Sequence, residues 1–119
     1  MDESILVSVK KMLGIPEDYD AFDMDIIIHI NSVLVTLYEL GVGDSVYTIT
    51  DSTDIWSDFL DDANELQLIQ TYMYLKVRLI FDPPTSSAAL QAMQELAREF
   101  EFRISILVDP EDSSEEVIS

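Results

Sequence analysis

The chain has 119 residues, 48% of them hydrophobic, which is enough for one domain with a modest core. It has no cysteine, which excludes disulfides and thiolate metal sites. Its 24 acidic and six basic residues give a net charge of −18, so direct DNA binding through a basic patch is disfavoured. No apolar run approaches the roughly 20 residues of a membrane span, and the N-terminus lacks the positive charge of a secretory signal, so we expect a soluble, cytosolic chain.

The charges are unevenly distributed along the chain. No Lys or Arg lies between Lys11 and Lys76, although 13 acidic residues do. All six bases fall in segments 10–11, 76–78 and 98–103. The simplest interpretation is a solvated acidic surface that keeps the protein soluble. A surface for a basic partner, or a wall that repels DNA phosphates, remains open as an alternative.

Two helices are predicted in the first third of the chain. The first spans roughly residues 3–13 and stops at Gly14. The second spans roughly residues 18–40, and Gly41 and Gly43 stop it by offering a left-handed backbone conformation. Apolar residues at a spacing of three and four predict its buried stripe: Tyr19, Phe22, Ile26, Ile30, Val33, Leu37 and Leu40.

Residues 41–51 are expected to form an extended loop. Residues 46–50 are β-branched and aromatic, as is typical of a strand, but a lone strand has no partner in a helical domain. A strand completed by a neighbouring subunit is the alternative. Residues 51–53, Asp-Ser-Thr, are a plausible cap for a short third helix over roughly 54–60.

The fourth predicted helix, roughly residues 64–81, is apolar on nearly every side. Such a helix must be covered on every side, which a chain of this size can hardly do alone. We therefore expect neighbouring subunits to cover part of it. Asp82, Pro83 and Pro84 stop the helix, because proline offers no N–H and disfavours a helical conformation in the residue before it.

The last predicted helix spans roughly residues 86–107 and is capped by a hydroxyl side chain from residues 85–87. The sequence thus predicts an all-α fold, a small bundle of about four to five helices with one extended loop (residues 41–51). We expect residues 1–107 to form a single helical domain and residues 108–119 a flexible acidic C-terminal tail.

No catalytic site emerges from the sequence. The single histidine, His29, lies four residues after Asp25 on one helix face, where the carboxylate could orient the imidazole as a base. No nucleophile pairs with it, so we expect a histidine on the helix surface or in a subunit contact. A glycosidase-like carboxylate pair is conceivable, but nothing selects one. Phosphate loops, nucleophile elbows and zinc spacings are absent, so we expect neither enzymatic activity nor a cofactor.

Four aspartates, Asp51, Asp54, Asp58 and Asp61, recur every three to four residues, as they would on one helical face. Carboxylates on such a face could bind Mg²⁺ or Ca²⁺. However, no glycine-turned calcium loop is present and a helix spaces carboxylates too widely for a compact cage. We therefore expect an acidic solvated face and no metal site.

The scarce bases lie in the two most apolar helices, which favours subunit contacts over a DNA patch. Lys76 and Arg78 point to different sides of the fourth helix, and Arg103 closes an ion-pair ladder with Glu95 and Glu99. The candidate residues for a subunit or partner interface are Tyr72, Tyr74, Lys76, Arg78, Phe81, Asp82, Pro83, Pro84 and Arg103.

Several short motifs occur in a recognisable order. They are Met-Leu-Gly-Ile-Pro at 12–16, Leu-Gly-Val-Gly at 40–43, a Trp-containing segment at 54–60, Tyr-Met-Tyr-Leu-Lys-Val-Arg-Leu-Ile-Phe-Asp-Pro-Pro-Thr-Ser-Ser at 72–87 and Glu-Phe-Arg at 101–103. In order and spacing the chain resembles the small head–tail connector (adaptor, or head-completion) proteins of long-tailed bacteriophages. Its last motif has Phe where Trp is usual in the family.

The resemblance implies a virion structural protein without enzymatic activity. Such proteins form a homo-oligomeric ring of about twelve copies, closed by head-to-tail contacts, between the portal protein and a tail-side stopper or tail-completion protein. Genomic DNA would pass through the ring during packaging or ejection without sequence-specific binding, and acids facing the bore would repel its phosphates. The chain would reside at the head–tail interface of the virion, and in the host cytoplasm during assembly.

The charge suggests how such a ring would form. Because each copy carries −18, self-repulsion at low salt should oppose spontaneous assembly, so we expect a mainly monomeric free protein and a ring nucleated by the portal. The acidic tail is expected to order on binding the portal. Two other functions stay open: an acidic DNA mimic that inhibits a DNA-binding protein, and a generic helical interaction module.

Overall fold

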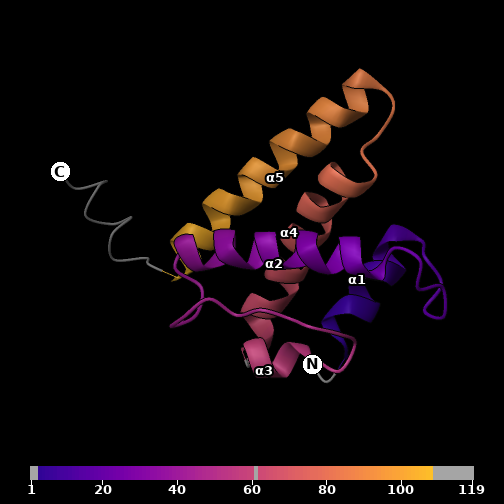
Figure 1. The fold of residues 1–119 in the computed structure, drawn as a ribbon. Helices are drawn as coiled ribbons and strands as arrows, with labels where there is room; N and C mark the ends of the chain where they lie inside the picture. The colour runs from indigo at the N-terminus through magenta and orange to yellow at the C-terminus, as the bar shows by residue number, and fades with distance from the viewer. Residues whose placement is uncertain (1–2, 61, 109–119) are drawn as a thin grey trace.

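The structure is a computed structural model that describes residues 3–60 and 62–108. Within those residues it has five helices and no strand: α1 (Ile5–Leu13), α2 (Asp23–Glu39), α3 (Trp56–Phe59), α4 (Ala63–Phe81) and α5 (Ser87–Val108) (Figure 1). The predicted all-α bundle is confirmed. The helix α5 includes Val108, which the prediction assigned to the acidic tail, and the rest of that predicted tail, residues 109–119, lies outside the described part.

Glycines end the two N-terminal helices as predicted. Gly14 and Gly41 have φ values of 80° and 104°, which favour a residue without a side chain. At the end of α2 the Gly41 N–H donates to the Tyr38 carbonyl, and the Val42 N–H donates to the Leu37 carbonyl at 2.9 Å. These are the hydrogen bonds of a Schellman motif, and Val42 and Leu37 are both buried, as is usual for that motif.

The start of α2 differs from the prediction. The helix begins at Asp23 and not near residue 18, because the Tyr19 and Asp23 amides make tight turns with the carbonyls three residues before them. Tyr19 and Phe22 are therefore exposed and do not belong to the buried stripe. The Phe22 ring instead packs edge-on against Phe81, with the ring centroids 5.3 Å apart.

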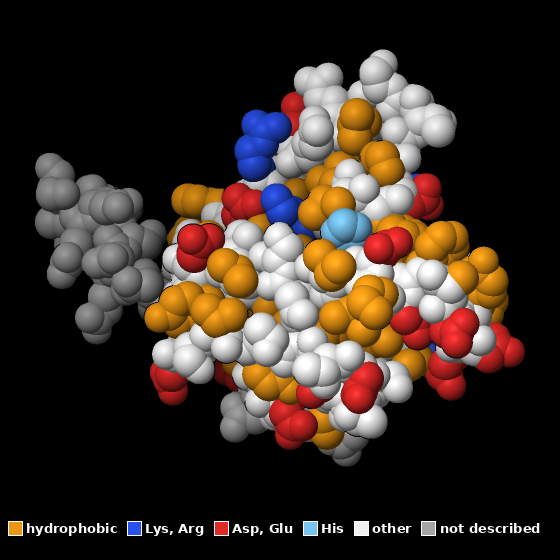
Figure 2. Space-filling view, in the orientation of Figure 1, with side chains coloured by type: hydrophobic (Ala, Val, Ile, Leu, Met, Phe, Trp, Pro, Cys, Tyr) orange, Lys and Arg blue, Asp and Glu red, His pale blue; other side chains and the backbone are white. Residues whose placement is uncertain are grey.

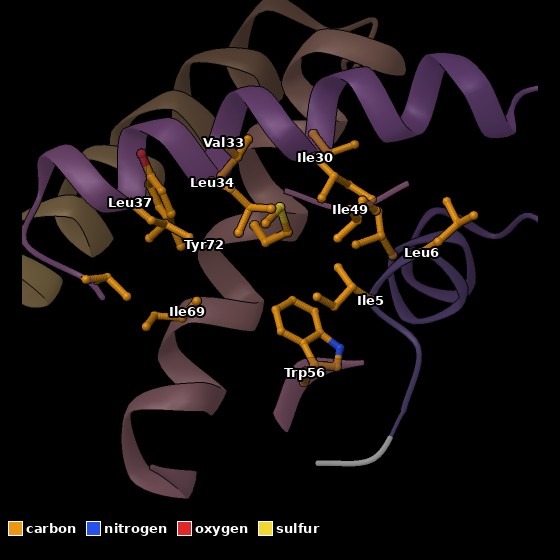
Figure 3. Packing of buried hydrophobic residues seen from close by; sticks show 14 of the residues in the cluster. Ile5, Leu6, Ile30, Val33, Leu34, Leu37, Ile49, Trp56, Ile69 and Tyr72 are labelled. Carbon is orange, nitrogen blue, oxygen red and sulfur yellow. The ribbon is translucent and has the colours of Figure 1, made fainter. Parts of the chain in front are cut away.

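The hydrophobic core lies where α4 crosses beneath α2 (Figures 1 and 3). Leu34 and Leu37 from α2, Ile69 and Tyr72 from α4, and Trp56 from α3 all contribute fully buried side chains. The helix α1 also packs on α2 and α4, and α5 covers another side of α4. The chain thus buries most of the apolar surface of α4 by itself.

This packing corrects the expectation that a chain of this size can hardly cover α4 alone. Tyr72, Met73, Leu75 and Val77 are almost completely buried within one chain. Among the described large hydrophobic residues of α4, Ile80 in the last turn is the one that is clearly exposed, at 51%. The sequence argument failed because three different helices of the same chain pack around α4.

The loop between α2 and α3 is extended, as predicted, and the side chain of Asn31 binds its backbone at Ile49. The Asn31 side chain donates from Nδ2 to the Ile49 carbonyl at 3.0 Å and accepts from the Ile49 N–H at 2.8 Å. It therefore pairs with the loop backbone as a neighbouring strand would. Ile49 is buried as a consequence.

The predicted cap of the third helix is wrong. The helix α3 begins after Ile55, which makes no capping hydrogen bond through its side chain. Asp51 accepts instead from the Thr53 N–H, and Asp54 accepts from the Thr50 N–H at 2.8 Å. The helix is held from elsewhere: its Trp56 indole donates to the Ser8 hydroxyl of α1 at 3.1 Å.

The helices α4 and α5 form a hairpin that projects from the body of the molecule (Figure 1). Asp82 leaves the helical conformation with φ −148° and ψ 67°, as expected before a proline. The Ser86 hydroxyl accepts from the Ala89 N–H at 3.1 Å, which confirms the predicted cap of α5. The double proline thus marks the tip of the hairpin.

Candidate interaction surfaces

A tyrosine and a lysine of α4 converge on one carboxylate of α5. The Tyr72 hydroxyl donates to Glu101 Oε2 at 2.7 Å, and Lys76 Nζ lies 3.6 Å from the same oxygen. Burial, followed by the hydrogen bond to Glu101, raises the pKa of Tyr72 far above its ordinary value. Because Tyr72 is fully buried, it serves the packing of α4 against α5 and offers no surface to a partner.

The last turn of α4 is held by Arg78. Its Nη1 donates to the Tyr74 hydroxyl at 2.9 Å and its Nε donates to the Asp82 carbonyl at 3.3 Å. The hydrogen bond to Tyr74 raises the pKa of the guanidinium, which therefore stays charged. Arg78 thus fixes the orientation of the chain just before Pro83.

The structure divides the predicted interface residues into two separate groups. Most of them gather in the C-terminal half of α4 and at the hairpin tip: Tyr74, Lys76, Arg78, Phe81, Asp82, Pro83 and Pro84. Arg103 lies near the other end of α5, where it pairs with Glu99 at 2.9 Å and stands over the Phe100 ring at 5.5 Å. The tip residues and Arg103 therefore do not form one continuous patch.

The alternative of a catalytic histidine gains no support from the geometry. His29 is partly buried, and its ring lies 6.4 Å from that of Phe81. In the part of the chain that the structure describes, no hydrogen bond joins His29 to Asp25. His29 is therefore part of an aromatic contact between α2 and the end of α4.

The aspartates before and within α3 do not share one helical face, contrary to expectation. Asp51 and Asp54 lie in the turn before the helix, Asp58 lies within it, and Asp61 is outside the described residues. Two hydrogen bonds from Thr53, the stronger from its hydroxyl, lower the pKa of Asp51. Across residues 3–60 and 62–108, no group of three or more potential ligands could hold a metal ion.

A buried ion pair between α1 and α2 was not foreseen. Lys10 Nζ lies 2.8 Å from Asp23 Oδ1 and donates to the Glu17 carbonyl at 3.0 Å. The sequence signal was weak, because Lys10 sits next to Lys11 at the end of an amphipathic helix, where basic residues usually face solvent. The pair fixes the segment that connects the two helices.

The outer side of α2 carries a second apolar stripe, which the sequence analysis also missed. Met24 and Ile28 are 74% and 59% exposed, and Val35 and Tyr38 continue the same side of the helix. Hydrophobic side chains are correspondingly visible across the face of the molecule on which α2 lies (Figure 2). We call Met24, Ile28, Val35 and Tyr38 the outer stripe of α2. The available signal was the spacing of these positions by four, seven and three residues, which places them on one side of a helix.

The comparison with known families decides what this helical chain is. A family model described as phage connector protein matches residues 5–111, nearly the whole chain. The chain belongs to the phage connector protein family. No curated protein and no solved structure matches it. Connector proteins are structural components of phage particles, so this connector is a bacteriophage head–tail structural protein that belongs to the virion.

The fold is consistent with that identity. The five described helices of this connector pack around one core, and charged and aromatic contacts between them stabilise the packing. None of the described helices is long and apolar enough to cross a membrane. Exposed hydrophobic side chains lie in the outer stripe of α2, at Ile80 in the last turn of α4 and on α5.

Proposed function

We propose that this connector assembles into a ring of about twelve copies between the portal protein and a tail-side stopper protein, closed by head-to-tail contacts through which one patch meets a different patch of the next copy. DNA passes through the middle of the ring without sequence-specific binding. The observation that carries the proposal is the outer stripe of α2, with Ile28 at 59% exposure on a chain of net charge −18.

Exposed apolar side chains on two different helices support head-to-tail contact. The outer stripe lies on α2, whereas exposed Leu96, Phe102 and Leu107 lie on α5. Exposed hydrophobic side chains that gather on one face mark interaction sites more often than chance exposure does. A DNA mimic would need a continuous acidic surface and no such apolar faces.

The hairpin tip and Arg103 supply further contacts in this proposal. Pro83 and Pro84 stand at the far end of a rigid antiparallel pair of helices, the position from which a subunit reaches a neighbouring ring. Arg103 is exposed, and its pair with Glu99 is a local i,i+4 contact that a partner carboxylate can replace. We assign the tip to the portal or stopper contact and Arg103 to a contact along the ring.

The high charge explains how assembly is timed. Copies that each carry −18 repel one another at low ionic strength, so the free protein stays largely monomeric and the portal nucleates the ring. Light scattering across a salt series checks this step. Stable rings formed at low salt without any partner would contradict it.

The proposal is tested with phage particles that lack this connector and are complemented with variants. Ile28→Glu places a charge in the outer stripe and should abolish incorporation while the free protein keeps its fold. Gln67→Glu makes the same charge change at an exposed position of α4 and should be incorporated normally. Electron microscopy of the head–tail vertex gives the readout. Normal rings with Ile28→Glu would refute the role of the stripe, and intact vertices without any connector would refute the ring.

A further inference from the structure

A short stretch of the loop between α2 and α3 has the pattern of a β-strand. Residues 46–50 run extended beneath α2 (Figure 1). Tyr47 and Ile49 pack on the hydrophobic core, whereas Val46 and Thr48, which alternate with them, are exposed. An alternation of this kind is typical of a strand that is covered on one face and open to solvent on the other.

One edge of this stretch is already paired. The N–H and the C=O of Ile49 both bind the side-chain amide of Asn31 from α2, so these two backbone groups point the same way. In an extended chain the two groups of one residue point to one edge, and those of the next residue point to the other. The extended conformation therefore directs the backbone groups of Val46 and Thr48 to the edge away from Asn31.

This second edge lacks a partner within the described chain. Among the residues that the structure describes, none forms a hydrogen bond with the backbone of Val46 or Thr48. The edge ends at Thr50, whose N–H donates to Asp54 Oδ2 at 2.8 Å. We call the backbone groups of Val46 and Thr48 the open edge. Unpaired backbone groups of an extended segment are the site at which a further strand can add.

The surroundings of the open edge are acidic. Burial, followed by the negative charges of Asp54 and Asp58, raises the pKa of the Tyr47 hydroxyl, so both carboxylates lie near this stretch. Asp44 precedes the stretch in the sequence, and residues 12–75 contain no Lys or Arg. Complementary charge favours a partner strand that carries basic side chains and disfavours an acidic one.

We propose that the open edge binds an extended, basic segment of a different protein, which adds to residues 46–48 as a β-strand. Main-chain hydrogen bonds to Val46 and Thr48 supply affinity, and Lys or Arg side chains near the aspartates supply selectivity. Another copy of this chain does not fit, because all six of its bases lie in α1, α4 and α5, where the backbone groups are used within the helices. This inference does not depend on the ring.

Solvent exchange of backbone amides, measured by NMR in the full-length protein, tests the open edge. The probe is a synthetic peptide of alternating Val and Lys with acetylated and amidated ends. With most of the protein bound, exchange at the Val46 and Thr48 amides should slow about tenfold, whereas the Tyr47 amide, on the other edge, should keep its rate. Unchanged exchange at Val46 and Thr48 in millimolar peptide would overturn the proposal, as would equal slowing at all three amides.

A pair of variants and a second peptide make the test specific. Thr48→Pro removes a donor of the open edge and should abolish the slowing at Val46, whereas Thr48→Val keeps the N–H and should preserve it. The fold should survive, because proline is tolerated on the free edge of a strand. In the unaltered protein, the same peptide with every backbone nitrogen methylated keeps its charges but has no backbone donor, and should cause no slowing. Equal slowing by both peptides would show a purely electrostatic contact and would overturn the proposal.

A dilution series separates a different protein from a second copy as the occupant of the open edge. Without peptide, amide exchange at Val46 and Thr48 should not depend on the concentration of the protein. Slowing that grows with the concentration of the protein alone would show that another copy pairs with the open edge, and would overturn the proposal.

Discussion

The ammonium group of Lys10 lies 2.8 Å from a carboxylate oxygen of Asp23, although only 1% of Lys10 is exposed. This ion pair joins the end of α1 to the first turn of α2, and a third group, the Glu17 carbonyl, accepts from the same ammonium. A charge buried to this degree is tolerated only when it is paired and hydrogen-bonded. The contact therefore makes the position of α2 depend on one lysine.

Removing Lys10 should destabilise the protein more than the loss of an ordinary surface lysine would, because its side chain is buried. Lys10→Met leaves the Asp23 carboxylate without its partner and should lower the free energy of unfolding by about 2–3 kcal/mol, below the range for fully buried pairs because the Asp23 side chain is 30% exposed. Urea denaturation provides the measurement. The double variant Lys10→Met/Asp23→Asn should recover at least half of the loss, and a double variant no more stable than the single one would contradict the pairing.

The burial of Tyr72, together with its hydrogen bond to Glu101, should make the stability of the protein sensitive to alkaline pH. The pKa of Tyr72 is raised in the folded state above its ordinary 10.0, so its stabilising contribution is complete below pH 10 and is lost as pH rises further and the unfolded chain ionises. Tyr72→Phe should lower the free energy of unfolding by about 1 kcal/mol at neutral pH. Above pH 10 this variant should lose less stability than the original protein, because it has no hydroxyl to ionise at this position. Thermal unfolding between pH 8 and about 11 measures both effects. Tyr19→Phe, at an exposed ring, is the control and should behave like the original protein.

Asn31 should control the order of the loop at residues 41–51. Asn31→Ala removes both hydrogen bonds to the Ile49 backbone and leaves a buried amide unpaired, at a cost of about 1–3 kcal/mol. Hydrogen exchange of the Ile49 amide should accelerate strongly. Ser32→Ala, at the next and exposed position of α2, should leave that exchange rate unchanged. An Ile49 amide that stays protected in Asn31→Ala would mean that the loop is held by other contacts.

The two prolines should set the geometry of the hairpin. Replacing Pro83 and Pro84 by Ala restores two backbone donors and removes the restriction on Asp82, so α4 can run on past its present end. Circular dichroism should show equal or greater helix content, whereas incorporation into particles should fail because the tip is misdirected. A variant that assembles with normal yield would show that the break is not needed for the contact.

Local chemistry made most helix boundaries predictable. Gly14 and Gly41 adopt the left-handed backbone that their position demands, and Ser86 caps α5 through its hydroxyl. These signals depend only on residues close in the sequence, so they can be read without knowing the fold. The start of α2 was placed too early because Tyr19 and Phe22 continue the apolar period although the backbone there forms turns.

Sequence alone established an all-α connector chain, the ends of most helices and the uneven charge, because periodicity, capping and composition are properties of short segments. Only the tertiary structure decided which apolar side chains stay exposed to solvent after the helices have packed. Three helices of the same chain cover α4, so Tyr72 is interior and the exposed stripe falls on α2. It also decided that Lys10 pairs with Asp23. Such outcomes depend on which helices lie side by side, and no single segment of sequence contains that information.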